Sequence, residues 1–165
     1  MKRIVVAGGC FWGVEEYFRR LKGVEKTSVG YVNGTKYKLT YEEVCSGVFQ
    51  AKEGVEIFYD ENIIDLNKIL EHLFRIIDPT SLDKQGNDVG VSYRTGVYYT
   101  DINDKTIIDN FIMNEQAKYN KPIVVEVELE NGFFHAEDYH QAYLVKNPSG
   151  YCHVNFSKIN ENELK

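Results

Sequence analysis

The chain has 165 residues with a formal net charge of −6, and 43% of them are hydrophobic against 27% charged. This length allows one domain with a sizeable core but not two ordinary domains, and the negative charge argues against a nucleic-acid or anionic-membrane surface, because both need clustered lysine and arginine. No apolar run approaches the roughly 18–20 residues of a membrane span, and the apolar run near the N-terminus is too short for a signal peptide, so we expect a cytoplasmic protein.

The first predicted elements are a strand and a helix joined by a short turn. Residues 3–7 (RIVVA) form a β-branched run that is typical of a buried strand. From Val14 onward, apolar residues recur at helical spacing, and Gly23 follows as a stop signal. Glu15 and Glu16 near the start of this helix agree with its dipole.

The remaining elements mix strands with helices. Strands are predicted at 26–32, 53–60, 95–100 and 123–129, helices at 66–78, 104–118 and 136–144, and loops at 33–47 and 79–91. In the strand at 53–60, Val55, Ile57 and Tyr59 alternate as in a strand with one buried face. The order strand, helix, strand, strand, helix, strand predicts an α+β fold, a two-layer split βαβ (ferredoxin-like) plait with an additional helix and strand and an extended C-terminal tail. We expect residues 1–165 to form a single catalytic domain.

Cys10 lies where the first strand ends and the first helix begins. A dinucleotide-binding loop would place G-x-G-x-x-G here, but the three positions read Gly8, Cys10 and Gly13, so the turn presents a thiol. The positive end of the helix dipole favours a thiolate, so we expect a lowered pKa for this cysteine. The alternative from spacing alone is a small, buried structural residue.

The cysteines and histidines show no metal-binding spacing. Cys10, Cys45 and Cys152 include no C-x-x-C pair and are too few for a secreted disulfide scaffold. The four histidines lack H-x-x-x-H spacing as well: His72, His135, His140 and His153. We therefore predict no metal site and expect His140 and His153 to pack or to form hydrogen bonds.

Several separated blocks resemble the peptide methionine sulfoxide reductase A family, in the order that the family has them. The pentapeptide GCFWG at 9–13 looks like the nucleophile motif of the family. The other matching blocks are TYEEVCSG (40–47), Glu53, DPTSLDKQGNDVG (78–90), YR (93–94), AEDYHQAYL (136–144) and KNPSGYCH (146–153). The resemblance runs from about Val5 to Val154. It implies a thiol-dependent enzyme that reduces methionine-S-sulfoxide, free or in proteins, and so repairs oxidised proteins without a bound cofactor.

The resemblance also implies roles for single residues. Cys10 would be the nucleophile and become a sulfenic acid, while Phe11 and Trp12 would form the wall of the pocket for the substrate methyl group. Protonation of the sulfoxide oxygen gives the sulfur cationic character, which an indole face favours. Glu53 would be the general acid, and we expect it to share one proton with Cys10, because two adjacent anions are costly.

Further positions match family residues at the rim of this site. Tyr41 and Tyr93 match phenols that donate hydrogen bonds to the sulfoxide oxygen, and Asp88 matches a residue that organises the pocket. Cys152 follows the flexible stretch NPSG and is the candidate resolving cysteine, whose disulfide with Cys10 a thioredoxin-like or glutaredoxin-like reductant would reduce. Cys45 is interpreted as a small structural residue.

The chain departs from the family pattern in several places. FQAKE at 49–53 replaces T-G-H-A-E, KLTY at 38–41 replaces N-P-T-Y, and GVSYR at 90–94 replaces G-T-Q-Y-R. His135 stands where a proline is usual. These departures bear on groups around the site and on substrate affinity, and they leave the principal residues in place.

Two other classes of function remain as alternatives at this point. A cysteine hydrolase or acyltransferase would pair Cys10 with a histidine base such as His140 and form an acyl intermediate. A non-enzymatic small-ligand-binding domain on the same fold would leave Cys10 buried and inert.

Overall fold

The computed structural model describes residues 1–36 and 38–165. Tyr37, which falls within the predicted loop at 33–47, lies outside the described residues. The helices are α1 (Phe11–Arg19), α2 (Tyr41–Cys45), α3 (Leu66–Ile76), α4 (Ile102–Glu115) and α5 (Tyr143–Lys146). The strands are β1 (Lys2–Ala7), β2 (Val24–Val32), β3 (Lys52–Tyr59), β4 (Lys84–Gln85), β5 (Asp88–Val89), β6 (Gly96–Tyr99), β7 (Glu126–Leu129) and β8 (Phe133–His135). Short 3-10 turns lie at Val91–Tyr93, Gln116–Lys118, Asp138–His140, Phe156–Lys158 and Glu161–Glu163.

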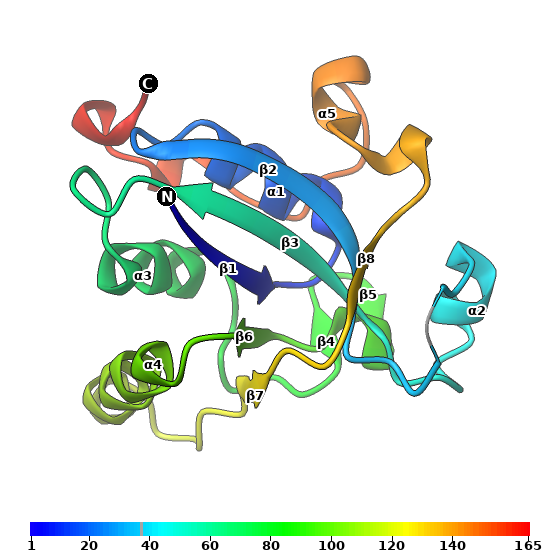
Figure 1. Ribbon diagram of the computed structural model, residues 1–165, viewed down its shortest axis with the longest axis horizontal. Coiled ribbons are helices and arrows are strands. Elements are labelled where there is room, and N and C mark those ends of the chain that lie inside the picture. Colours follow the sequence, from blue (N-terminus) through cyan, green and yellow to red (C-terminus); the bar gives the residue numbers. More distant parts are fainter. Residues whose placement is uncertain (37) are drawn as a thin grey trace.

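A curled sheet forms the frame of the molecule, with strand order β7-β6-β1-β3-β2-β8 (Figure 1). β1 pairs antiparallel with β3 and β6, and β2 pairs antiparallel with β3 and β8. β7 lies parallel to β6, so the chain passes from one edge of the sheet to the other between β7 and β8. The α+β class predicted from the sequence is confirmed, whereas β8 was not predicted.

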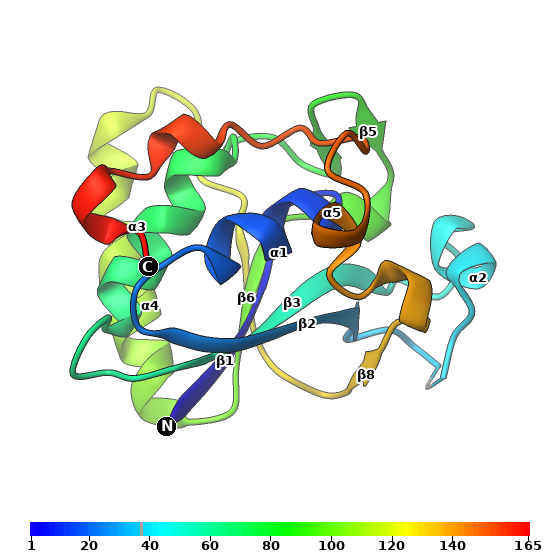
Figure 2. The ribbon, with the colours of Figure 1, turned by 90° about the horizontal axis from the view of Figure 1, so that it is seen from above.

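Both faces of the central strands are buried, which differs from the half-buried strand predicted at 53–60. On the face that carries α1 and α3 (Figure 2), side chains such as Val55 and Ile57 pack into the main core with no exposed surface. On the other face, Lys52 and Glu56 are also buried, at 4% and 8% exposure. The alternation identifies the two faces correctly, but it cannot show that the second face is covered.

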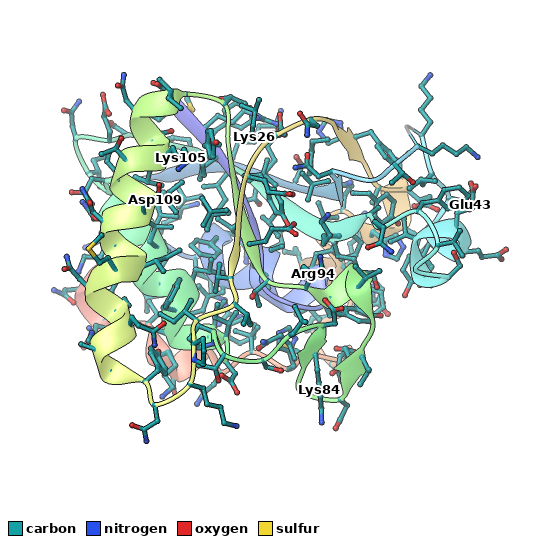
Figure 3. All side chains as sticks on the ribbon, turned by 90° about the horizontal axis from the view of Figure 1, so that it is seen from below. Lys26, Glu43, Lys84, Arg94, Lys105 and Asp109 are labelled. Carbon is teal, nitrogen blue, oxygen red and sulfur yellow. The ribbon has the colours of Figure 1, made fainter. Side chains whose placement is uncertain are left out.

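Ion pairs fill the face of the sheet away from α1. The Arg3 guanidinium contacts Glu56 at 2.6 Å and Glu130 at 2.9 Å. Arg94, labelled on this face in Figure 3, contacts Asp83 at 2.7 Å and Glu126 at 3.2 Å. The acidic groups buried on this side therefore have cationic partners.

Two helical segments differ from the prediction. α1 begins at Phe11, three residues before the predicted start, because the residues after Cys10 already form its first turn. Residues 136–144 do not form one helix, because Ala142 has a left-handed backbone (φ 49°) and separates a 3-10 turn from α5. Its N–H donates to the Glu15 carboxylate at 2.8 Å, which holds this turn against α1. α2, within a predicted loop, is stabilised by a capping box between Thr40 and Glu43.

The C-terminal residues are fastened to α3, and α3 in turn contacts α1. The Arg75 guanidinium makes two hydrogen bonds to Glu163, at 2.8 and 3.1 Å. His72, only 1% exposed, contacts the Tyr17 hydroxyl at 2.7 Å, and burial lowers its pKa to about 4.

Among residues 1–36 and 38–165, no helix combines the length and the apolar character needed to cross a membrane.

The buried His72 makes folding stability depend on pH. The unfolded chain takes up a proton near pH 6.5, whereas folded His72, with a pKa of about 4, does not. Its neutral form therefore contributes stability that is complete above pH 6.5 and is lost as the pH falls toward 4. Urea unfolding measures the free energy of unfolding at pH 7 and at pH 4.5. We expect His72→Gln to make the difference between these two free energies smaller by about 1–3 kcal/mol. Equal pH dependence of stability in wild type and His72→Gln would contradict the expectation.

Candidate active site

Cys10 and Glu53 come together at the start of α1. Cys10 is the N-cap residue of this helix, directly after the turn that ends β1, and it is 8% exposed. Glu53 points from β3 toward the same turn and is 2% exposed. Its Oε1 accepts a hydrogen bond from the Phe11 N–H at 3.2 Å, and its Oε2 is buried without a partner among the described residues. A buried carboxyl without a cationic partner is costly in its ionised form.

The pKa values of the pair follow from this burial. Burial raises the pKa of Glu53 to about 8, against a smaller opposing effect of the Phe11 N–H. Burial and the neighbouring Glu53 raise the pKa of the Cys10 thiol, and the Trp12 backbone N–H offsets only part of that rise. The lowered thiol pKa expected from the helix dipole is therefore wrong for this structure, because desolvation outweighs the dipole. Burial thus favours the protonated form of both groups, whereas the sequence led us to expect a single shared proton.

Two phenols and a carboxylate lie around this pair. Tyr41, at the start of α2, and Tyr93, in the turn before β6, have pKa values raised by burial and then by interactions that include the charge of Glu53. Both phenols therefore stay protonated as hydrogen-bond donors over the physiological pH range. Asp88, on β5, contributes to the raised pKa values of Cys10 and Glu53 and accepts a hydrogen bond from the Tyr151 hydroxyl at 2.9 Å. The fold thus gathers these groups from separate elements.

An aromatic cluster holds the only tryptophan. The Trp12 indole stacks on the Tyr143 ring, with centroids 3.8 Å apart and an interplanar angle of 11°. Its Nε1–H donates to His140 Nδ1 at 2.9 Å, so the neutral imidazole carries its proton on Nε2. Phe11 is 1% exposed and belongs to the main core, with its ring centroid 5.1 Å from that of His140. Trp12 keeps part of its surface open.

Comparison with known proteins identifies the family of this chain. The family model described as peptide methionine sulfoxide reductase matches residues 2–165. The peptide methionine sulfoxide reductase MsrA of Clostridium botulinum (strain Loch Maree / Type A3) is 56% identical over 154 residues, which cover 93% of this chain and 98% of that protein. The chain belongs to the peptide methionine sulfoxide reductase family.

Solved structures of relatives agree with this assignment. Mxr1 from Saccharomyces cerevisiae in its reduced form is similar to the reductase with a TM-score of 0.87 and 34% identity, over 92% of this chain and 88% of that one. Mxr1 in complex with Trx2 is similar with a TM-score of 0.63 and 25% identity, over 86% of this chain and 84% of that one. The resemblance identified from the sequence blocks is thereby confirmed.

The two other cysteines of the reductase differ in their surroundings. Cys152 is half-buried, and its Sγ accepts a hydrogen bond from the Val154 N–H at 3.3 Å. Cys45, interpreted from the sequence as a small structural residue, lies at the end of α2, where it is exposed and interacts with the Tyr41 side chain. Within the described residues, no group of three or more His, Cys, Asp or Glu side chains could hold a metal ion.

Sequence reasoning missed part of this site. Tyr143, Tyr151 and Glu137 each support a site residue, the last by accepting hydrogen bonds from the Tyr31 hydroxyl and the Tyr41 N–H. All of them lie in the blocks at 136–144 and 146–153 that match the family. The match therefore pointed to these residues, but it could not show which site residues they contact. The expectation that His140 and His153 form hydrogen bonds is confirmed.

The reactivity of Cys10 tests the electrostatics of the pair. Because the charge of Glu53 raises the pKa of the thiol, Glu53→Gln is expected to move the pH midpoint of Cys10 alkylation by iodoacetamide to lower pH. Peptide mapping separates Cys10 from Cys45 and Cys152. Glu56→Gln, on the same strand but the opposite face, is the matched control and is expected to leave the midpoint in place. A midpoint that stays fixed or rises in Glu53→Gln would show that the charge does not act on the thiol.

Proposed function

We propose that this chain reduces methionine-S-sulfoxide, free or in proteins, to methionine and thereby repairs oxidised side chains. The observation that carries the proposal is the pairing of a cysteine thiol at the head of α1 with a buried carboxyl that is protonated at neutral pH. A sulfoxide needs a nucleophile for its sulfur and a proton for its oxygen, and this pair supplies both. Membership of the family supports the same reaction. The preference for the S epimer rests on the family resemblance.

The first step transfers oxygen from the substrate to Cys10. The Glu53 carboxyl, with a pKa of about 8, donates its proton to the sulfoxide oxygen while Tyr41 and Tyr93 donate hydrogen bonds to it. Cys10 attacks the sulfur that has become electrophilic, and its own proton returns to Glu53. Methionine leaves, and Cys10 becomes a sulfenic acid, so the sulfoxide is reduced by two electrons and the thiol is oxidised by two.

The substrate methyl group is assigned to Phe11 and Trp12. Trp12 is held by the Tyr143 stack and the hydrogen bond to His140, which fixes the orientation of its indole face. A fixed indole both recognises the methyl group and favours the cationic sulfur that protonation creates. Asp88, which accepts a hydrogen bond from Tyr151, is assigned the role of organising the pocket.

Cys152 and an external dithiol complete the cycle in this proposal. The Cys152 thiol attacks the sulfenic acid, water leaves, and a Cys10–Cys152 disulfide forms. A thioredoxin-like protein, or a glutaredoxin-like one, then reduces the disulfide. The complex of Mxr1 with Trx2 supports the thioredoxin-like reductant.

We also assign residues 1–165 to one catalytic domain built on a split βαβ plait. The strand order β6-β1-β3-β2, with antiparallel pairing throughout, supports the plait. β7 and β8 extend it at the two edges.

The hydrolase alternative is not favoured, because its base is engaged elsewhere. His140 Nδ1 accepts from Trp12, and the ring packs between aromatic side chains. A purely ligand-binding domain gives no reason for a buried acid beside the thiol.

The decisive test is mass spectrometry on the reduced protein with one equivalent of each methionine sulfoxide epimer and no other reductant. We expect methionine from the S epimer alone and a Cys10–Cys152 disulfide in the peptide map. Cys10→Ser is the control and is expected to yield no methionine. If neither epimer loses oxygen, the proposed reaction is wrong.

The acid role of Glu53 predicts a pH profile. Glu53 donates a proton only while it is protonated, so the single-turnover rate is expected to fall as the pH rises through about 8. Glu53→Gln is expected to lower the rate by about 10²–10⁴ and to remove this limb of the profile. Unchanged dependence on pH in Glu53→Gln would assign the proton to another group.

A further inference from the structure

Cys152 packs against α1 at Gly13, where the close contact leaves no room for a side chain on the helix. A Cβ atom built on Gly13 would stand 2.7 Å from Cys152 Sγ and 3.0 Å from Val154 Cγ2. Carbon and sulfur cannot approach so closely, so any side chain at Gly13 would displace the cysteine. Gly13 is the third residue of the helix that Cys10 caps. The second glycine of the GCFWG motif is therefore a contact surface for the second cysteine.

The neighbouring residue, His153, fastens the same segment to the catalytic turn. Its Nε2 lies 2.9 Å from the Gly8 carbonyl oxygen. Because a carbonyl only accepts, Nε2 carries the hydrogen of this bond. A Cβ atom on Gly9, where φ is +90°, would stand 3.0 Å from the same nitrogen. The backbone of Gly8, Gly9 and Gly13 thus forms one surface, which we term the glycine seat.

The segment on the glycine seat is held on both sides. Before it, the Tyr151 hydroxyl donates to Asp88 at 2.9 Å. After it, Val154 is buried at 8% exposure, and the Arg20 guanidinium lies 4.1 Å from the centroid of the Phe156 ring. Figure 2 shows the C-terminal chain running back over α1 and α3 from this point. The segment is thereby anchored close to the nucleophile.

We infer that Gly13 and His153 are positioning residues that dock the segment of Cys152 on the first turn of α1 for formation of the disulfide. This inference rests on the proposed function. In the docked step a sulfur–sulfur bond forms between Cys152 and the Cys10 sulfenic acid, the sulfur–oxygen bond breaks, and hydroxide leaves with the thiol proton as water. An N-cap side chain lies within reach of the second and third residues of its helix. Cys10 is the N-cap residue of α1, and Cys152 Sγ lies against Gly13 in the first turn of the same helix, so the fold brings both cysteines to this turn.

The experiment forms the sulfenic acid in two ways, with one equivalent of methionine-S-sulfoxide and with hydrogen peroxide, and follows the Cys10–Cys152 disulfide by quenched mass spectrometry. Peroxide makes the test independent of reductase activity. In His153→Ala we expect unchanged methionine formation, disulfide formation slowed about 3- to 10-fold, and more dimedone adduct at Cys10. Gly13→Ala, which adds one methyl group at a helical position, is expected to fold and to slow the disulfide step by at least about 10-fold.

Matched variants separate docking from a general structural effect. His153→Gln restores a donor toward Gly8 and is expected to recover part of the rate, while Ser157→Ala, beyond the seat, is expected to match wild type. In the reduced protein, maleimide labelling of Cys152 is expected to rise in His153→Ala. The inference would be overturned if His153→Ala and Gly13→Ala both formed the disulfide at the wild-type rate. It would also be overturned if His153→Ala slowed methionine formation as much as the disulfide step. So would a wild-type protein that forms no Cys10–Cys152 disulfide with peroxide, whereas loss of methionine formation alone would count against the proposed function.

Discussion

The buried carboxyl of Glu53 sets the conditions for the rest of the site. Its Oε1 takes one hydrogen bond from the Phe11 N–H, and its other oxygen has no partner among the described residues. In such surroundings ionisation is unfavourable, so the group holds its proton at neutral pH. The same amide belongs to the first turn of α1, which Cys10 caps. The hydrogen bond from the Phe11 N–H to Glu53 therefore joins β3 to the start of α1 and holds the acid near the Cys10 thiol.

Glu53 and Glu56 show how the two faces of one strand give one residue type opposite properties. Glu56 faces Arg3, whose guanidinium bonds it at 2.6 Å, and this partner together with Ser28 lowers its pKa despite burial. Glu53 faces α1 and the aromatic side chains, where burial dominates, and its pKa rises. The far face thus neutralises its carboxylates with cations, and the near face keeps an acid in its neutral form. Lys52, one of the departures from the family pattern, lies on the far face beside Glu126 at 3.4 Å.

The C-terminal third of the chain completes the site by lying across α1. Gln141 uses its side-chain amide to bond the backbone N–H and carbonyl of Val29 on β2, at 2.9 and 2.8 Å. The Glu15 carboxylate accepts a hydrogen bond from the N–H of Ala142 in the left-handed turn. The next residue, Tyr143, stacks on the Trp12 ring. The short helix α1 thus carries Cys10 at its N-cap and Trp12 in its first turn, and it contacts the segment of Cys152 through Gly13.

The sequence by itself determined the α+β class, the main strands and helices, and the family. It could do so because alternation and helical spacing are local, and because the blocks around Cys10, Glu53 and Cys152 keep their order along the chain. It also placed the thiol correctly at a strand-to-helix turn. It did not give the start of α1 at Phe11, the burial of both faces of β3, or the break at Ala142. Each of these depends on residues far apart in sequence, such as Glu15 with Ala142.

Only the tertiary structure decided the protonation of the site. From the sequence, the helix dipole favoured a thiolate at Cys10, and an acid at Glu53 was expected to share its proton. The fold removes water from both groups and places them beside each other, and the cost of desolvating a charge exceeds what a helix end supplies. Burial is a property of the assembled molecule, so no reading of neighbouring residues could have supplied it.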